Sequence, residues 1–260
     1  MQARWILLAW LIFAGTHLAL GLPPWRDRLA ARLGEQRFVA LFSAIAAISL
    51  GLLALAVALH GGSGSAGPAL GQIAALRVVL GGLAALGLCL AIVGLMNYMR
   101  SPMALFRTRL NLPAGIECIS RHPFFVGFAL FAAAHALLAT TRASMLHFLG
   151  FAVLAVAGAL LQDRKLLLRH GTAYADYLAA TSLLPGLALA QGRQRLARND
   201  PVWRRILWAT AVVVVLLATH RLWSAFNGAV LAGLMAIGGL SMSARRWLHA
   251  ERVAATAARP

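Results

Sequence analysis

Seven runs of mostly apolar residues, separated by charged or glycine-rich segments, dominate this sequence. A helix needs about 20 such residues to cross the hydrocarbon core of a bilayer. Backbone polar groups must be satisfied internally in lipid, so the runs predict an all-α, polytopic transmembrane helical bundle. The predicted spans are Trp5–Leu22, Phe38–Leu59, Val78–Met99, Phe124–Thr140, Met145–Leu161, Ile206–Thr219 and Ala225–Met242.

The composition separates this chain from soluble protein classes. Hydrophobic residues make up 61% of it and charged residues only 12%, against about 45–50% and about 25% in soluble domains. A net charge of +17 is also found in nucleic-acid binders, but those proteins are far less apolar. We therefore expect a lipid bilayer and no nucleic acid as partner. The two cysteines, Cys89 and Cys118, form no CxxC motif, which excludes a disulfide framework and a thiolate metal cluster. The sequence does not indicate an oligomeric state.

The basic residues orient the predicted spans. The segments after the first, third, fifth and seventh spans carry 20 of the 24 Lys and Arg residues. Loops rich in Lys and Arg stay in the cytoplasm, so we expect the N-terminus outside and the C-terminus in the cytoplasm. Residues 1–21 also have the outline of a signal peptide. The four arginines of the first inner loop outweigh Arg4, however, and favour an uncleaved span.

The segment 191–200 divides the chain. It is basic and rich in Gln, as in a linker, and Pro201 follows it at a position where a helix can begin. We therefore predict a five-span membrane domain over residues 1–190 and a basic linker over 191–200. Residues 201–260 then form a C-terminal appendage of two spans.

Two local patterns predict contacts between helices. Ser43, Ala47 and Gly51 place a small residue at every fourth position of the second span, which lets helix backbones approach closely. Residues 141–144 are the only connection between the fourth and fifth spans. A connection this short predicts a tight antiparallel hairpin.

Two histidines lie inside predicted spans, where an ionisable side chain is costly and by default suggests a function. His17 is in the first span and His135 in the fourth. Each shares its helical face with small residues and one phenylalanine, Phe13 or Phe131. Such a face can admit a flat haem between helices. In the alternative interpretation, each histidine only hydrogen-bonds to a neighbouring helix. Histidines at span ends or in loops are His60, His147, His170, His220 and His249.

A second polar group is predicted at the cytoplasmic surface. Arg121 and His122 open the fourth span, and Asp163 follows the end of the fifth. Because these two spans form a hairpin, the three side chains should emerge together, which makes them candidate catalytic residues. Tyr174 and Tyr177 indicate an interfacial helix with aromatic anchors after them. A structural ion pair beside a membrane-anchoring helix explains the same residues.

Several motifs of the chain occur together in one known family. They are Ile119-Ser120-Arg121-His122-Pro123-Phe124-Phe125-Val126-Gly127, Ala134-His135-Ala136-Leu137, Asp163-Arg164-Lys165, Gly171, and, near the N-terminus, Phe13 with His17, Leu33-Gly34-Glu35, Arg37-Phe38 and Phe42-Ser43. The combination resembles the NnrU family over roughly residues 5–190. This resemblance implies a multi-pass protein of the bacterial inner membrane, associated with denitrification and nitric-oxide metabolism.

NnrU-like proteins are in turn similar to 15-cis-zeta-carotene isomerase, which carries haem b. The similarity implies haem b with His17 and His135 as its iron ligands. It also implies nitrogen-oxide metabolism or isomerase-like redox chemistry, the latter on a hydrophobic substrate. The isomerase has a cysteine three residues before its second ligand, where this chain has Ala132. Its redox ligand switch is therefore not implied here.

The Arg-His-Pro motif at 121–123, with Tyr174 and Tyr177, also resembles the isoprenylcysteine carboxyl methyltransferase superfamily. This second resemblance implies S-adenosylmethionine bound at the cytoplasmic face. Gln162 and Asp163 stand where those enzymes usually have paired glutamates. A third alternative is a non-enzymatic accessory protein for denitrification, and the sequence leaves open whether the chain is an enzyme.

Overall fold

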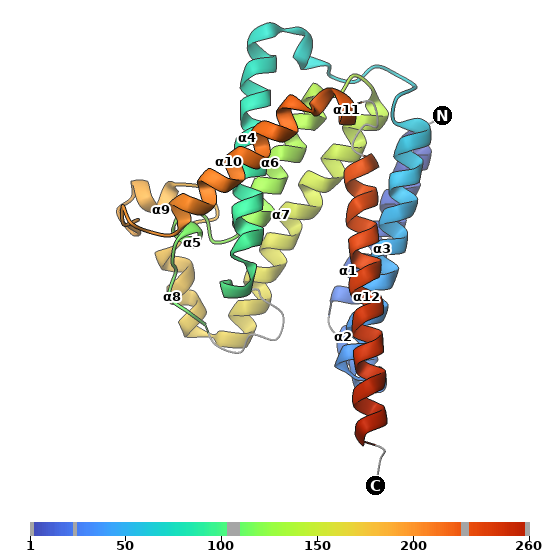
Figure 1. Ribbon diagram of the computed structural model, residues 1–260, viewed down its shortest axis with the longest axis vertical. Coiled ribbons are helices and arrows are strands. Elements are labelled where there is room, and N and C mark those ends of the chain that lie inside the picture. The colour runs from blue at the N-terminus through green and yellow to red at the C-terminus, as the bar shows by residue number, and fades with distance from the viewer. Residues whose placement is uncertain (1–2, 23–24, 103–109, 225–228, 258–260) are drawn as a thin grey trace. The chain divides into compact units, whose positions relative to one another are not determined.

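The structure is a computed structural model that describes residues 3–22, 25–102, 110–224 and 229–257. The regular elements in these ranges are all helical, as predicted (Figure 1). The seven longest helices are α1 (Ala3–Gly21), α3 (Glu35–His60), α4 (Ala74–Met96), α6 (Pro123–Leu138), α7 (Arg142–His170), α10 (Val202–Ala218) and α12 (Ala229–Ala257). Shorter helices are α2 (Trp25–Leu33), α5 (Ile116–Ile119), α8 (Thr172–Ala180), α9 (Leu187–Ala190), α11 (His220–Ser224) and the two 3-10 turns η1 (Leu70–Gln72) and η2 (Tyr98–Arg100).

A helix covers most of each predicted span. Within the described residues, α1, α3, α4 and α7 are long and apolar enough to cross a membrane, and α6 is a shorter apolar helix. These helices support a multi-pass membrane protein, while the number of spans and their orientation stay predictions. The seventh predicted span begins at residues 225–228, which lie outside the described residues. Its remainder forms the first half of α12.

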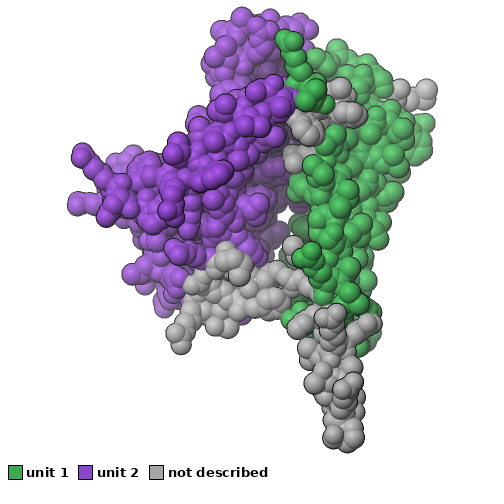
Figure 2. All heavy atoms as spheres, in the orientation of Figure 1, with its two compact units in different colours: residues 1–67, 140–147, 221–260 green, residues 68–139, 148–220 purple. Residues whose placement is uncertain are grey.

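The chain forms two compact units, which are coloured separately in Figure 2. Unit 1 comprises residues 1–67, 140–147 and 221–260, and unit 2 comprises residues 68–139 and 148–220. The two long C-terminal helices belong to different units. Helix α10 packs against α4 in unit 2, and α12 packs along α3 in unit 1.

In unit 1, the predicted small-residue face of α3 packs against α12. A Cβ added to Gly51 would lie 3.8 Å from the Cβ of Ala236, and one added to Gly239 would lie 3.0 Å from the Cβ of Ala47. Close to this contact, the Ser243 hydroxyl donates a 2.6 Å hydrogen bond to the carbonyl of Ala40. The prediction of a close helix contact from small-residue spacing is therefore confirmed.

In unit 2, glycines bring α4 and α6 together. A Cβ at Gly87 would lie 2.7 Å from the carbonyl oxygen of Gly127, and a Cβ at Gly127 would overlap the backbone of Gly87 and Ala91. A Cβ at Gly94 would likewise overlap the backbone of Phe124 at the start of α6. The two backbones are in direct contact, so these positions do not accept a larger side chain.

Helices α6 and α7 pack antiparallel within unit 2, as the hairpin prediction requires. The ring of Phe128 lies 5.4 Å from that of Phe151. Phe125, which is closer to the start of α6, covers Gly158, which is closer to the C-terminal end of α7. The next contact in this register joins the start of α6 to Asp163, and it forms the candidate site.

Candidate functional site

Asp163 lies within α7, because this helix is longer than the predicted span. The apolar pattern predicts a span that ends at Leu161 and a separate interfacial helix after Asp163. In the structure α7 continues to His170, and the chain then turns at Gly171, whose φ is +56°. That conformation favours glycine, and α8 follows directly. The separate helix predicted after Asp163 therefore begins only at Thr172, as α8 (Thr172–Ala180), which carries the two tyrosines; its interfacial position stays a prediction.

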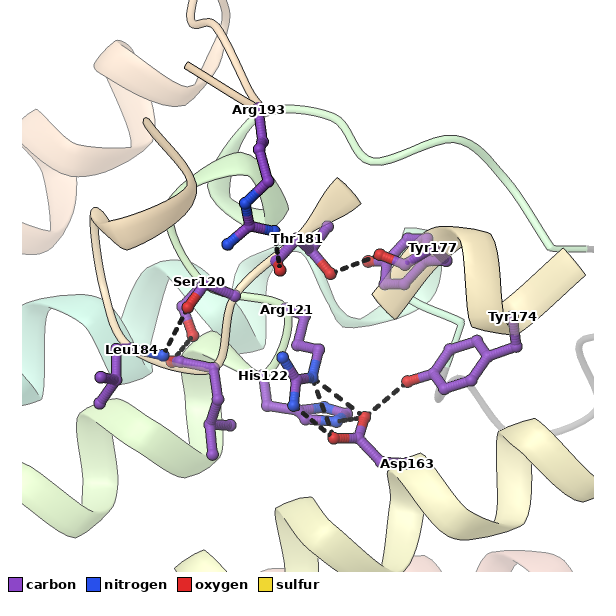
Figure 3. Close-up of polar contacts among 11 residues, drawn as sticks. Ser120, Arg121, His122, Asp163, Tyr174, Tyr177, Thr181, Leu184 and Arg193 are labelled. Carbon is purple, nitrogen blue, oxygen red and sulfur yellow. Dashed lines mark hydrogen bonds and ion pairs between the residues drawn. The ribbon is translucent and has the colours of Figure 1, made fainter. Parts of the chain in front are cut away.

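The carboxylate of Asp163 is the centre of a cluster of four side chains (Figure 3). Arg121 Nε donates to Oδ2 at 2.9 Å, and Arg121 Nη2 lies 2.8 Å from the same oxygen. The Nε2 of His122 lies 2.6 Å from Oδ1, and the Tyr174 hydroxyl donates to Oδ1 at 2.7 Å. The structure thus places the three predicted candidate residues together and adds Tyr174 to them.

The geometry of the cluster identifies its charge state. A carboxylate that accepts hydrogen bonds from a guanidinium, an imidazole and a phenol is stabilised in its ionised form. The Nε2 of His122 is then the donor in its contact with Asp163. Only 16% of the Arg121 side chain and 13% of the Asp163 side chain are exposed, and His122 is 1% exposed. The cluster is therefore a mostly buried ionic network with a narrow exposed edge.

The position of His122 follows from the start of α6. His122 is the N-cap residue, and Pro123 occupies the first turn, where its missing N–H leaves no hydrogen bond unmade. This confirms the sequence interpretation of the Arg-His-Pro motif as a helix start. The motif fixes the direction in which the His122 side chain leaves the helix.

Hydrogen bonds to a distant segment hold the backbone before α6 in place. The amide of Arg121 donates to the carbonyl of Ser182 at 2.9 Å, and the amide of Gly186 donates to the carbonyl of Ile119 at 2.9 Å. The Ser120 hydroxyl adds a 2.9 Å bond to the carbonyl of Leu183. These contacts orient the backbone that carries Arg121 and His122, and no sequence motif indicated them.

Arg193 fixes that distant segment in turn. Its Nη1 donates to the carbonyl oxygens of Ala179 at 2.6 Å and Thr181 at 2.7 Å, at the C-terminal end of α8. A basic side chain is favourable there, because the last carbonyls of a helix have no partner within it. Sequence analysis assigned Arg193 to a linker. No pattern in the sequence indicated this role.

Two stacked tyrosines extend the cluster away from Asp163. The rings of Tyr174 and Tyr177 lie 5.4 Å apart at an angle of 12°. Burial, together with the hydrogen bond to Asp163, raises the pKa of Tyr174 above its ordinary value. Burial and the nearby charge of Glu117 raise the pKa of Tyr177. Both phenols therefore remain protonated at physiological pH.

Glu117 is the polar residue that sequence analysis missed. It lies in α5, is 3% exposed and interacts with Tyr177. An acidic residue in a loop whose other charged residues are basic was the available signal, since the chain has only seven acidic residues. Buried carboxyl groups in proteins are almost always paired.

The two candidate haem ligands have similar surroundings but belong to different compact units. In unit 1, the His17 ring lies 5.6 Å from Phe13 and 5.1 Å from Phe42. In unit 2, the His135 ring lies 4.3 Å from Phe131 and 5.0 Å from Phe148. The aromatic neighbour predicted for each histidine is present, and each has a second one. No group of three or more His, Cys, Asp or Glu side chains in the described residues could hold a metal ion.

One comparison with known proteins finds a match, and it covers most of the chain. A family model described as NnrU protein matches residues 5–227. The chain belongs to the NnrU family. The match confirms the resemblance drawn from the motifs and extends past residue 190, where the motifs ended, to include α10. No curated protein and no solved structure shows a significant match.

Proposed function

We propose that this NnrU-family membrane protein binds haem b, with His135 and His17 as iron ligands, and acts in nitrogen-oxide metabolism. The observation that carries the proposal is the hydrogen bond of His135. Its Nδ1 lies 2.9 Å from the carbonyl oxygen of Phe131 and donates to it. A metal-binding histidine almost always uses its other ring nitrogen in this way, because the bond fixes the tautomer and ring orientation. The lone pair of Nε2 is then available for iron.

The surroundings of His17 fit the same group. Its Nδ1 is buried and has no hydrogen-bond partner among the described residues. A buried polar atom without a partner costs roughly 1–3 kcal/mol, so its persistence in an apolar span calls for a ligand or a partner. The aromatic rings of Phe13 and Phe42 beside it can pack against the face of a macrocycle.

When bound, haem would supply reversible one-electron chemistry, with the imidazoles of His17 and His135 holding its iron. The residues of this chain would hold the iron through two neutral nitrogens and exclude water with phenylalanine side chains. The proposal therefore suits electron transfer or redox-controlled binding, in an accessory role or in isomerase-like chemistry.

The cytoplasmic cluster bears on the methyltransferase alternative. S-adenosylmethionine presents a carboxylate and an ammonium group, for which a protein needs available basic and acidic side chains. Here Arg121 and Asp163 bind each other in a bidentate contact, and His122 and Tyr174 occupy the remaining acceptor positions of Asp163. We therefore propose that the cluster mainly stabilises the packing of α6, α7 and α8.

The test is the absorption spectrum of a series of histidine variants purified from haem-replete cells. We expect His135→Ala to lose most of the Soret band and His17→Ala to weaken it, whereas His60→Ala, at the end of α3, leaves it unchanged. Binding of S-adenosylmethionine is measured on the same samples by calorimetry. A Soret band that survives His135→Ala, or millimolar cofactor binding without any haem, would replace this proposal.

A further inference from the structure

We propose that residues 193–204 of unit 2 form a binding surface for the headgroup of an anionic phospholipid. Three exposed arginines, Arg195, Arg198 and Arg204, supply its charge, and the half-exposed indole of Trp203 lies in the same segment. This segment joins α9 to the first turn of α10. The proposal is independent of haem binding, and it gives a role to the basic segment that the sequence predicts as a linker.

The segment carries more positive charge than the protein itself neutralises. Residues 191–205 contain five arginines and one acid, Asp200. The Asp200 Oδ1 accepts the amide of Val202 at 2.8 Å, at the start of α10. The ion pairs in the described part of the chain involve none of Arg195, Arg198 and Arg204. These three guanidinium groups are therefore available to an anion from outside the protein.

The other two arginines hold the segment in place. Arg193 donates from Nη1 to two carbonyl oxygens at the C-terminal end of α8. Arg205 donates from Nη1 to the Oδ1 of Asn97 at 2.6 Å. The indole N–H of Trp203 donates to the carbonyl of Ala197 at 2.9 Å. Because the backbone between these contacts is fixed, less conformational freedom is lost when a ligand binds.

The surface lies where three apolar stretches of unit 2 begin or end. Asn97, the partner of Arg205, directly follows the last residue of α4. One turn earlier, a Cβ at Gly94 would overlap the backbone of Phe124 at the start of α6. Helix α10 is apolar over Ile206–Ala218 except for one threonine. Since these stretches meet at one level, we expect the edge of the hydrocarbon there and the exposed arginines among the headgroups.

Charge and position together select the class of ligand. A guanidinium binds two phosphate oxygens at once, which an isolated point charge does not do. The ammonium of a zwitterionic headgroup would be repelled by three neighbouring arginines, whereas phosphatidylglycerol has no such group. The Trp203 side chain is 47% exposed, and indole rings favour the headgroup region of a bilayer. A phospholipid with net negative charge therefore fits this surface best.

The experiment measures lipid binding to the full-length protein in detergent by thermophoresis. The probe is phosphatidylglycerol with eight-carbon chains, compared with phosphatidylcholine of the same chain length and with inorganic phosphate. Each basic side chain near an anionic surface contributes roughly a fivefold gain in binding, so we expect phosphatidylglycerol to bind about tenfold more tightly than either comparison ligand. In Arg195→Gln/Arg198→Gln/Arg204→Gln its affinity should fall by about tenfold or more.

The matched control removes the same charge from unit 1. Arg28→Gln/Arg32→Gln/Arg37→Gln replaces three exposed arginines in a region that also contains Asp27 and Glu35. This variant should bind phosphatidylglycerol nearly as tightly as wild type. Equal losses in the two triple variants would reveal attraction to net charge alone and overturn the proposal.

Two results with the wild-type protein would also overturn it. Equal affinity for phosphatidylcholine and phosphatidylglycerol would mean that the arginines do not select an anionic headgroup. Equal affinity for inorganic phosphate and phosphatidylglycerol would assign the surface to a soluble anion. Thermal unfolding checks that both triple variants fold. If the first does not, the single variants Arg195→Gln, Arg198→Gln and Arg204→Gln decide: each should weaken binding about three- to fivefold, and wild-type affinity in all three would refute the proposal.

Discussion

Replacing Asp163 should weaken the end of unit 2 at which α6 begins. Asp163→Ala removes the shared acceptor of Arg121, His122 and Tyr174. Breaking a buried ion pair costs about 3–5 kcal/mol, and an exposed pair contributes about 0–1 kcal/mol. Since the Arg121 and Asp163 side chains are 16% and 13% exposed, we expect a loss of about 3 kcal/mol. Asp163→Asn retains one acceptor oxygen and should lose about half as much.

The measurement is thermal unfolding of the purified protein in detergent. For a chain of this size about 3 kcal/mol corresponds to a decrease in Tm of roughly 6–12 °C. Asp176→Ala is the matched control, because Asp176 is an exposed acid on α8; we expect its Tm to change by less than about 2 °C. The haem spectrum should persist in both variants, since His135 lies about 20 Å along α6 from the cluster. A Tm for Asp163→Ala within the range of the control would refute a stabilising role for the network.

Two further predictions concern helix packing and the tyrosines. Gly127→Ala should destabilise unit 2 by about 1–3 kcal/mol, because the Cβ of the new alanine would overlap the α4 backbone. The control is Gly82→Ala, whose Cβ would have no atom within 4 Å and which should be neutral in the same unfolding assay. In Tyr98→Phe the only remaining phenols are Tyr174 and Tyr177. Both pKa values are raised, so their stabilising contribution is complete below about pH 10 and is lost only as the pH rises through the higher folded-state values. Titration of this variant to about pH 11 should therefore give no tyrosinate absorbance before unfolding, and an early rise would show that the phenols are solvated.

Structural features that depend on a local sequence pattern, or on the register of a hairpin, could be predicted from the sequence. Pro123 marks the start of a helix because of its own backbone chemistry, and the short connection after α6 forces α7 to return alongside it. Together these features were enough to bring His122 and Asp163 to one end of the hairpin. The same reasoning identified the α3 face that packs on α12, because the spacing of small residues is a property of one helix.

Contacts between distant segments could not be predicted in this way. The bonds between residues 119–121 and 182–186 join two irregular segments, and neither carries a periodic pattern. Helix α7 extends beyond its apolar part because most of residues 162–170 are Gln, Arg, Lys or Leu, which are good helix formers even where they are charged. The packing of α10 against α4 likewise joins side chains more than 100 positions apart in the sequence, as in the hydrogen bond from Arg205 to Asn97.

The most direct test of haem binding is the absorption spectrum of the wild-type protein, purified from haem-replete cells. We expect a coloured protein with a Soret band, about one haem b per chain by pyridine haemochrome assay, and the split visible bands of a low-spin centre on reduction. A colourless protein, folded by its thermal transition and unable to take up added haem, would contradict the proposal that His135 is an iron ligand.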